Sequence, residues 1–172
     1  MVDQLQILAE RLRDAEFLHI VLEGVSLYGL LFGLIFFVAS FALKEQKIQL
    51  IALAVIGLSA LISIPHMKNR RLAESHMIEI RPSYSKRISD HTELRASRQI
   101  AYYAVAIGAV LTVVTRKSKA GPLVMWLTIA GAGCVFLMGL WLHMKEAEIL
   151  QPNILLGPGT EAVIKPYSRP ER

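Results

Sequence analysis

Four histidines stand where long apolar segments of the sequence begin or end: His19, His66, His91 and His143. Neutral imidazole is an axial ligand of haem iron, and two histidines on different helices hold the iron from its two faces. His19 and His66 lie 47 residues apart, and His91 and His143 lie 52 apart, so each pair frames one helical hairpin. We therefore predict that at least one pair among these four candidate residues binds haem b and ligates its iron; the four together would suit two haems, or one haem and a spare site. The alternative is that they anchor helix ends at the membrane interface without a cofactor.

The ends of the apolar segments also share short sequence matches. The tripeptide His-Met-Lys occurs at residues 66–68 and at residues 143–145, and His-x-x-Leu-x-small begins at His19 and again at His91. We interpret these matches as a weak duplication of a two-helix unit, which predicts two similar helical hairpins. The two methionines would suit copper together with imidazole, but adjacent helical residues point about 100° apart and do not easily share a metal.

Glu23 is the only acidic residue inside an apolar run of the sequence. An intramembrane carboxylate is a functional candidate, either for proton transfer or for pairing with a basic residue such as Arg95. Because Glu23 lies near the end of its run, its side chain also has the option of reaching the interface. The sequence leaves these roles open.

The elements that must position these residues are four apolar segments, at residues 17–43, 49–66, 99–115 and 122–143. Each is near the length of about 20 residues that a helix needs to cross about 30 Å of hydrocarbon. Apolar residues make up 53% of the chain, and the segments lack the alternation of barrel strands. We therefore predict an all-α integral membrane protein in which residues 17–148 form a four-transmembrane-helix bundle.

Helical phase predicts which faces of these segments point inward. Small residues share the predicted inward faces, among them Gly33, Ala132 and Gly139. Such residues would admit a flat macrocycle between helices, but they are also the usual means by which membrane helices approach each other. Asp90 and Glu93 resemble a capping box, which predicts that the third helix starts there.

The two ends of the chain flank the bundle. Residues 1–16 carry Leu5, Leu8 and Leu12 at helical spacing, which predicts an amphipathic interfacial helix or an extension of the first span. We expect no cleavable signal peptide, because acidic residues interrupt this segment. Residues 149–172 hold four of the seven prolines and are predicted to form an extended tail.

Basic residues are unevenly divided between the two predicted ends of the bundle. Five of the 19 Lys and Arg residues lie in the two short hairpin loops, and the other 14 lie at the opposite end with both termini. The positive-inside tendency therefore places both termini in the cytoplasm, which we expect for a multi-pass protein of the bacterial inner membrane. The net charge of +5 predicts contact with anionic membrane lipids, and no nucleic-acid motif is present.

Catalytic motifs give little support for an enzyme. The sequence has no phosphate loop and no recognisable nucleophile–base set, so we expect no turnover of its own. The single cysteine, Cys134, excludes an intramolecular disulfide. His76 is expected to be solvated in the middle loop, and the pair Arg70–Arg71 to contact lipid headgroups, with haem propionates as the alternative.

Several stretches carry a resemblance to a known family: His19 at the start of the first span, residues 57–65 and 139–143 at the ends of two spans, and Asp90-His91 before the third. Together they resemble an uncharacterised bacterial four-helix membrane protein family found beside or fused to Rieske and cytochrome c domains. The resemblance covers most of the predicted bundle and implies a role near membrane electron transfer. The chain departs from that pattern because no His-Pro opens its first span.

Three functions remain at this point. The first is a small membrane subunit in electron transfer, a b-type cytochrome that works with other subunits and with quinone or a redox protein. The second is a cofactor-free structural or assembly subunit of a respiratory or photosynthetic membrane complex. The third is a proton or metal transporter that uses Glu23 and the histidines, although no polar path continues to the opposite side. We favour the first, because it explains why His19, His66, His91 and His143 all fall at the same end of the predicted bundle.

Overall fold

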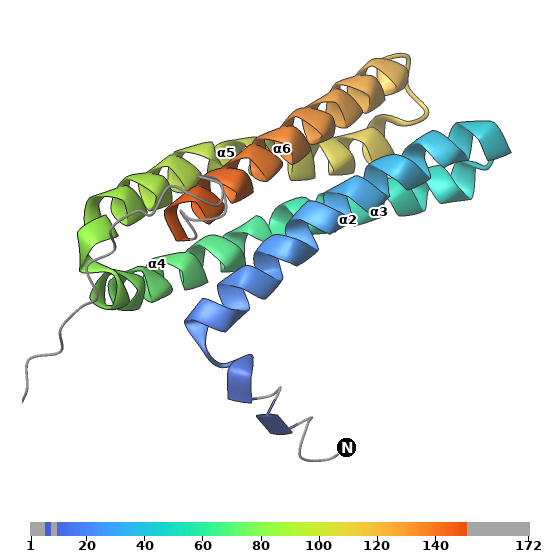
Figure 1. Cartoon of the computed structure of the whole chain (residues 1–172). Helices are drawn as coiled ribbons and strands as arrows, with labels where there is room; N and C mark the ends of the chain where they lie inside the picture. Colours follow the sequence, from blue (N-terminus) through green and yellow to red (C-terminus); the bar gives the residue numbers. More distant parts are fainter. Residues whose placement is uncertain (1–5, 8–9, 151–172) are drawn as a thin grey trace, which may run out of the picture.

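The computed structural model describes residues 6–7 and 10–150 and is built from helices (Figure 1). They are α2 (Ala15–Leu43), α3 (Gln46–Leu61), α4 (Ser63–Ile80), the short 3-10 helix η1 (Pro82–Tyr84), α5 (Ser85–Thr115) and α6 (Gly121–Leu150). Helices α3 and α4 follow one another along one line, so the described chain passes along the bundle four times. These four passes are each long and apolar enough to cross a membrane. The predicted four-helix fold is therefore confirmed at this level.

One end of the bundle carries the start of α2, the ends of α4 and α6, and the start of α5 (Figure 1). We call it the polar end, because the predicted histidines gather there. The opposite end carries two short connections. In the first, Lys44 closes α2 in a left-handed conformation with φ of 53°, and its N–H donates to Phe41 O at 3.2 Å.

Two predictions at the polar end are wrong, the loop position of His76 and the capping box at Asp90. The span predicted at residues 49–66 continues as helix to Ile80, so exposed His76 lies on α4 rather than in a loop. Helix α5 begins at Ser85, which places Asp90 inside the helix and excludes the predicted capping box. The reason is that Pro82, with its fixed φ, starts a single 3-10 turn that leads directly into α5.

The α3–α4 rod is interrupted at Ile62, where one helix ends and the next begins. Pro65 lies one turn further on and has no N–H, so it cannot donate to the carbonyl of Leu61. The flanking bonds persist: Ile62 N–H donates to Leu58 O, and His66 N–H donates to Ile62 O, both at 3.1 Å. The interruption therefore leaves α3 and α4 as one continuous rod.

Helices α2 and α3 touch through small residues. Gly29 faces Ser59, and a Cβ at Gly33 would stand 2.5 Å from Ile56 Cγ1 and 3.3 Å from the carbonyl oxygen of Ala52. Gly29 and Gly33 are four residues apart, which is the G-x-x-x-G spacing that lets membrane helices approach closely. Gly33 thus serves helix packing, which was one of its two predicted roles.

The bundle core lies between α2, α3, α5 and α6 and is apolar. Its fully buried members include Leu30, Ile56 and Ala132. Gly139 belongs to the same packing, because a Cβ there would stand 2.7 Å from the Tyr102 hydroxyl oxygen. Ala132 and Gly139 of α6 are therefore occupied by close helix contacts, as one of the two interpretations predicted.

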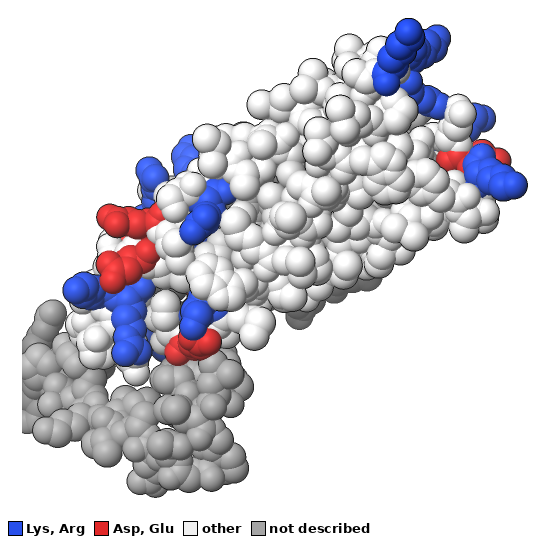
Figure 2. Space-filling model, turned by 90° about the horizontal axis from the view of Figure 1, so that it is seen from above, with Lys and Arg blue, Asp and Glu red and all other residues white. Residues whose placement is uncertain are grey.

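The outer surface is apolar along the middle of the bundle. Figure 2 shows Lys, Arg, Asp and Glu gathered at the two ends of the visible face, with an uncharged band between them. Large apolar side chains of the four passes are exposed, including Ile107 and Val114. Such a band is what a helix bundle presents to hydrocarbon.

The two chain ends lie mostly outside the described residues. Of the leucines in the predicted amphipathic segment 1–16, Leu5 and Leu8 are outside and Leu12 is exposed. Helix α2 begins where Asp14 caps it, accepting the N–H of Glu16 at 2.9 Å. The predicted tail 149–172 is also outside, except for its first two residues, which continue α6.

Candidate functional site

The polar end contains a buried ion network with one charged residue from each of the four spans: Glu23, Arg70, Arg95 and Glu146. Glu146 is the centre of this network. Its Oε1 accepts from Arg70 Nη1, and its Oε2 accepts from Arg95 Nη2 at 2.6 Å. The network contains two positive and two negative groups, so its charges compensate each other within an enclosed site.

Glu23 extends the network to α2. The same Arg95 nitrogen, Nη2, donates to Glu23 Oε1 at 2.6 Å, which confirms the predicted pairing of Glu23 with Arg95. Glu23 Oε1 also contacts His143 Nδ1 at 3.2 Å. The Glu23 side chain is largely buried and the His143 side chain is half exposed, so this pair lies at the edge of the network.

His19 and His66 are brought together by α2 and α4. Their ring centroids are 6.2 Å apart, and both residues are buried. Nδ1 of His19 and Nε2 of His66 have no hydrogen-bond partner among the described residues. His19 Nε2 lies 3.9 Å from Glu146 Oε1, which links the pair to the ion network.

His91 and His143 are not paired in the same way. His91 is buried, and its Nε2 is 3.1 Å from the carbonyl oxygen of Leu142. His143 instead contacts Glu23. All four predicted histidines therefore lie at the polar end, but the contacts show only His19 and His66 as a facing pair of rings.

Helical periodicity explains how each span contributes. His19 and Glu23, and likewise His66 and Arg70, are four residues apart and so lie on one face of their helices. His91 and Arg95 repeat this spacing on α5. Each of these three spans thus presents a histidine and a charged residue, one turn apart, to the same interior.

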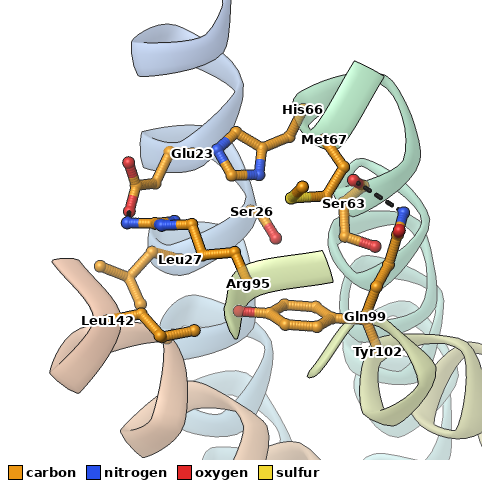
Figure 3. Close-up of a pocket in the computed structure, with 11 residues that line it drawn as sticks. Glu23, Ser26, Leu27, Ser63, His66, Met67, Arg95, Gln99, Tyr102 and Leu142 are labelled. Atoms are coloured by element: carbon orange, nitrogen blue, oxygen red, sulfur yellow. Dashed lines mark hydrogen bonds and ion pairs between the residues drawn. The ribbon is translucent and has the colours of Figure 1, made fainter. Parts of the chain in front are cut away.

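A small cavity lies beneath the network and holds about 30 Å³ (Figure 3). In Figure 3, Glu23 and Arg95 point toward each other while Gln99 reaches toward Ser63; that amide donates to the Ser63 carbonyl at 3.3 Å. The cavity also borders His66. Its volume suits a water molecule, which needs two to four polar partners of this kind.

A larger cavity of about 540 Å³ opens at the polar end between α2, α4 and α6. Glu23 borders both cavities, so it stands between the open one and the small inner one. The open cavity is bounded by both polar and apolar residues: Glu16, His19, Ile20, Glu23, Met77, Ile80, Arg81, His143, Glu146 and Ala147.

Two central residues of the network, Arg70 and Glu146, were not predicted as site residues. Arg70 is among the most completely buried side chains, so its predicted contact with lipid headgroups is wrong. Both residues lie beyond the apolar runs from which the sites were sought. Continuing the helical spacing from His66 to Arg70, and from Leu142 to Glu146, would have found them.

A metal centre made by protein ligands alone finds no support in the contacts. Across residues 6–7 and 10–150, no group of three or more His, Cys, Asp or Glu side chains is arranged to hold a metal ion. Haem differs, because its iron takes only two ligands from the protein. His19 and His66 are the residues that would hold such an iron, because their ring centroids are 6.2 Å apart and each ring has one unpartnered nitrogen.

No protein-family model, no curated protein and no solved structure matches the chain. The resemblance to the four-helix family found beside Rieske and cytochrome c domains therefore stays a prediction. The functional argument rests on the geometry of the polar end.

Proposed function

We propose that this protein is a small membrane subunit in electron transfer, with haem b bound between His19 and His66. The observation that carries the proposal is the neighbouring pair of buried imidazoles, with ring centroids 6.2 Å apart and one unpartnered nitrogen in each ring. Bound haem would supply one-electron transfer. Glu146, beside His19, would orient that imidazole and compensate positive charge at the site.

The membrane setting belongs to the same proposal. Four apolar helices and the uncharged band between charged ends support insertion as a multi-pass protein. The excess of Lys and Arg on the side of the termini supports a bacterial inner membrane location with both termini in the cytoplasm. The polar end would then face the cytoplasm, and any reductant or oxidant would approach from that side or from the lipid.

A reduced-minus-oxidised absorbance spectrum of the purified protein in mild detergent tests the haem proposal, together with a pyridine haemochrome assay. We expect an α-band at roughly 560 nm, the region of b-type haem. His19→Ala and His66→Ala should each lose this band, whereas His76→Ala should keep it, because His76 is exposed on the outside of α4. A colourless protein from cells supplied with haem would exclude this function.

A second function, the cofactor-free structural subunit, is favoured by a different observation. The four-membered ion network connects every span and is neutral overall, so it closes the polar end without requiring a bound group. In that case the histidines stabilise the helix ends. A colourless, metal-free protein that unfolds when Glu146 is changed, and that copurifies with other membrane subunits, would support this alternative.

A further inference from the structure

The lining of the open cavity carries charges of both signs. The polar groups that border it are three carboxylates, one guanidinium and two imidazoles, those of Glu16, Glu23, Glu146, Arg81, His19 and His143. The arginine partners of Glu23 and Glu146 belong to the buried ion network and do not border this cavity. An occupant of one charge sign would therefore face like charge on part of the wall, which is costly. The lining fits a group that has both a positive and a negative part.

The apolar residues of the same lining reach the outer surface of the bundle. Ile20 and Ile80 are 59% and 60% exposed, and Ile80 directly precedes Arg81 in the chain. Charged and apolar side chains therefore meet at the mouth of the cavity. The mouth lies at the polar end, where the uncharged band of the bundle gives way to charged residues (Figure 2). In a bilayer this boundary is the depth of the phospholipid headgroups.

The size of the cavity suits a headgroup rather than a whole lipid. About 540 Å³ lies within the range of roughly 300–1,000 Å³ that small-molecule sites occupy. A lipid that places its headgroup there keeps its acyl chains outside, against exposed apolar side chains such as Ile20. These chains add apolar contact that a water-soluble headgroup lacks. The cavity is therefore better matched to a lipid than to a small soluble zwitterion.

The positive part of the headgroup is expected to be a primary ammonium. Within the described part of the chain, both hydrogen bonds of Glu23 end on Oε1, and the contact of Glu16 with His76 also uses Oε1. The Oε2 atoms of both carboxylates thus remain as acceptors for N–H donors. A trimethylammonium group has no N–H and is typically held by aromatic rings. None of the described residues that border the cavity is Phe, Tyr or Trp.

The negative part of the headgroup is expected to be a phosphate. Arg81 follows the last residue of α4, and a guanidinium binds phosphate through paired N–H donors. Arg81 also has a contact within the protein, but its five donors are enough for more than one partner. One phosphate compensates this guanidinium, whereas a headgroup with a net negative charge would face three carboxylates without an ammonium of its own.

We infer that this cavity binds the headgroup of a phosphatidylethanolamine-type lipid, which joins a primary ammonium to a phosphate. The ammonium lies at the carboxylates of Glu16 and Glu23, and the phosphate lies at Arg81. The net charge of +5 attracts anionic lipids to the surface as a whole, but the cavity selects a headgroup without net charge. The inference rests on the proposed membrane setting and goes beyond electron transfer, because it needs no haem.

Native mass spectrometry of the full-length protein in detergent tests the inference, with phosphatidylethanolamine, phosphatidylcholine and phosphatidylglycerol of identical acyl chains as probes. We expect phosphatidylethanolamine to bind about tenfold more tightly than either of the others, because neither can donate an N–H hydrogen bond to a carboxylate. Equal binding of phosphatidylcholine, or equal or tighter binding of phosphatidylglycerol, would overturn the inference. Soluble phosphoethanolamine tests the source of the headgroup, and its displacement of the lipid at equal concentration would overturn the assignment to a lipid.

Two variants locate the lipid in this cavity. Glu16→Gln should reduce the preference for phosphatidylethanolamine over phosphatidylcholine by about threefold, because Glu23 remains. Arg81→Gln should weaken all three lipids by about tenfold, because they share the phosphate. Glu79→Gln and Arg71→Gln are the matched controls, since both residues are exposed on α4 and neither borders the cavity. Either variant that binds lipids like its control would overturn the inference.

Folding and the membrane setting are checked on the same samples. Glu16 and Arg81 lie outside the buried ion network, so each variant should keep the size-exclusion profile of the unchanged protein. The headgroup comparison on the unchanged protein decides the inference if a variant does not fold. A protein that stays monodisperse without detergent would contradict the membrane setting, whereas a detergent-dependent protein without headgroup preference would overturn this inference alone.

Discussion

A single nitrogen of Arg95, Nη2, donates to Glu23 Oε1 and to Glu146 Oε2, each at 2.6 Å. Through this one atom α5 connects α2 with α6, and Glu146 then reaches Arg70 on α4. In a low-dielectric surrounding, a buried charge without its partner is costly, so each member of this chain holds the others in place. The relative rotation of all four spans at the polar end is therefore tied to one set of contacts.

Removal of the charge of Glu146 should destabilise the protein strongly. Glu146→Gln leaves Arg70 and Arg95 with one carboxylate, Glu23, and we expect a loss of about 3 kcal/mol in the free energy of unfolding. Unfolding in mixed micelles with increasing SDS measures this loss. Glu148→Gln is the control, because the Glu148 side chain is partly exposed and, within the described part of the chain, pairs with Lys145, so its effect should stay below about 0.5 kcal/mol. Similar losses for both variants would contradict the assigned network.

The close packing of α2 against α3 should not tolerate a methyl group at Gly33. In Gly33→Ala the new Cβ would meet Ile56 Cγ1 at 2.5 Å and backbone atoms of α3 within 3.3 Å, which cannot all move aside. We expect a loss of about 2 kcal/mol in the same SDS unfolding assay. Gly133→Ala serves as the control, since its Cβ would meet no atom within 4 Å and alanine favours helix. An unaffected Gly33→Ala would show that α2 and α3 are further apart.

The contact of Gly139 with Tyr102 should behave as a coupled pair. Gly139→Ala places a Cβ 2.7 Å from the Tyr102 hydroxyl oxygen and 3.3 Å from Leu27 Cδ1, so we expect a loss of about 1–2 kcal/mol. Tyr102→Phe removes the hydroxyl oxygen, and the double variant should recover most of the loss. A double-mutant cycle of unfolding free energies measures this coupling. Additive effects of the two changes would contradict the contact.

The proposed orientation is tested by labelling single cysteines in whole cells. In a Cys134→Ala background, a cysteine replacing Lys119 should react with a membrane-impermeant maleimide, because the connection from α5 to α6 is expected outside the cytoplasm. A cysteine replacing Ser83, which is exposed in η1 at the polar end, should react only after the cells are opened. The reverse pattern would place both termini outside the cytoplasm, and labelling of both in intact cells would exclude the four-pass arrangement.

The sequence by itself determined the class of fold and the position of the four histidines at one end of the bundle. Apolar runs of membrane-spanning length and helical spacing are local properties, so they predicted four helices and placed all four histidines at one end. An acidic residue inside an apolar run indicated either proton transfer or pairing with a basic residue such as Arg95, and the contact with Arg95 is present. The full lengths of α4 and α5 were not predicted. Charged residues lower the hydropathy of these helices near the polar end, although α4 stays helical up to Ile80 and α5 is helical from Ser85.

Only the tertiary structure decided which polar groups meet. The rotation and tilt of whole helices set His19 against His66, turned His91 to the carbonyl of Leu142, and buried Glu146. These contacts depend on packing elsewhere, such as the approach at Gly33, and no local pattern encodes them. A hydrophobic pattern predicts which residues of one helix face inward. Which residue of another helix each of them contacts depends on how all four passes pack together.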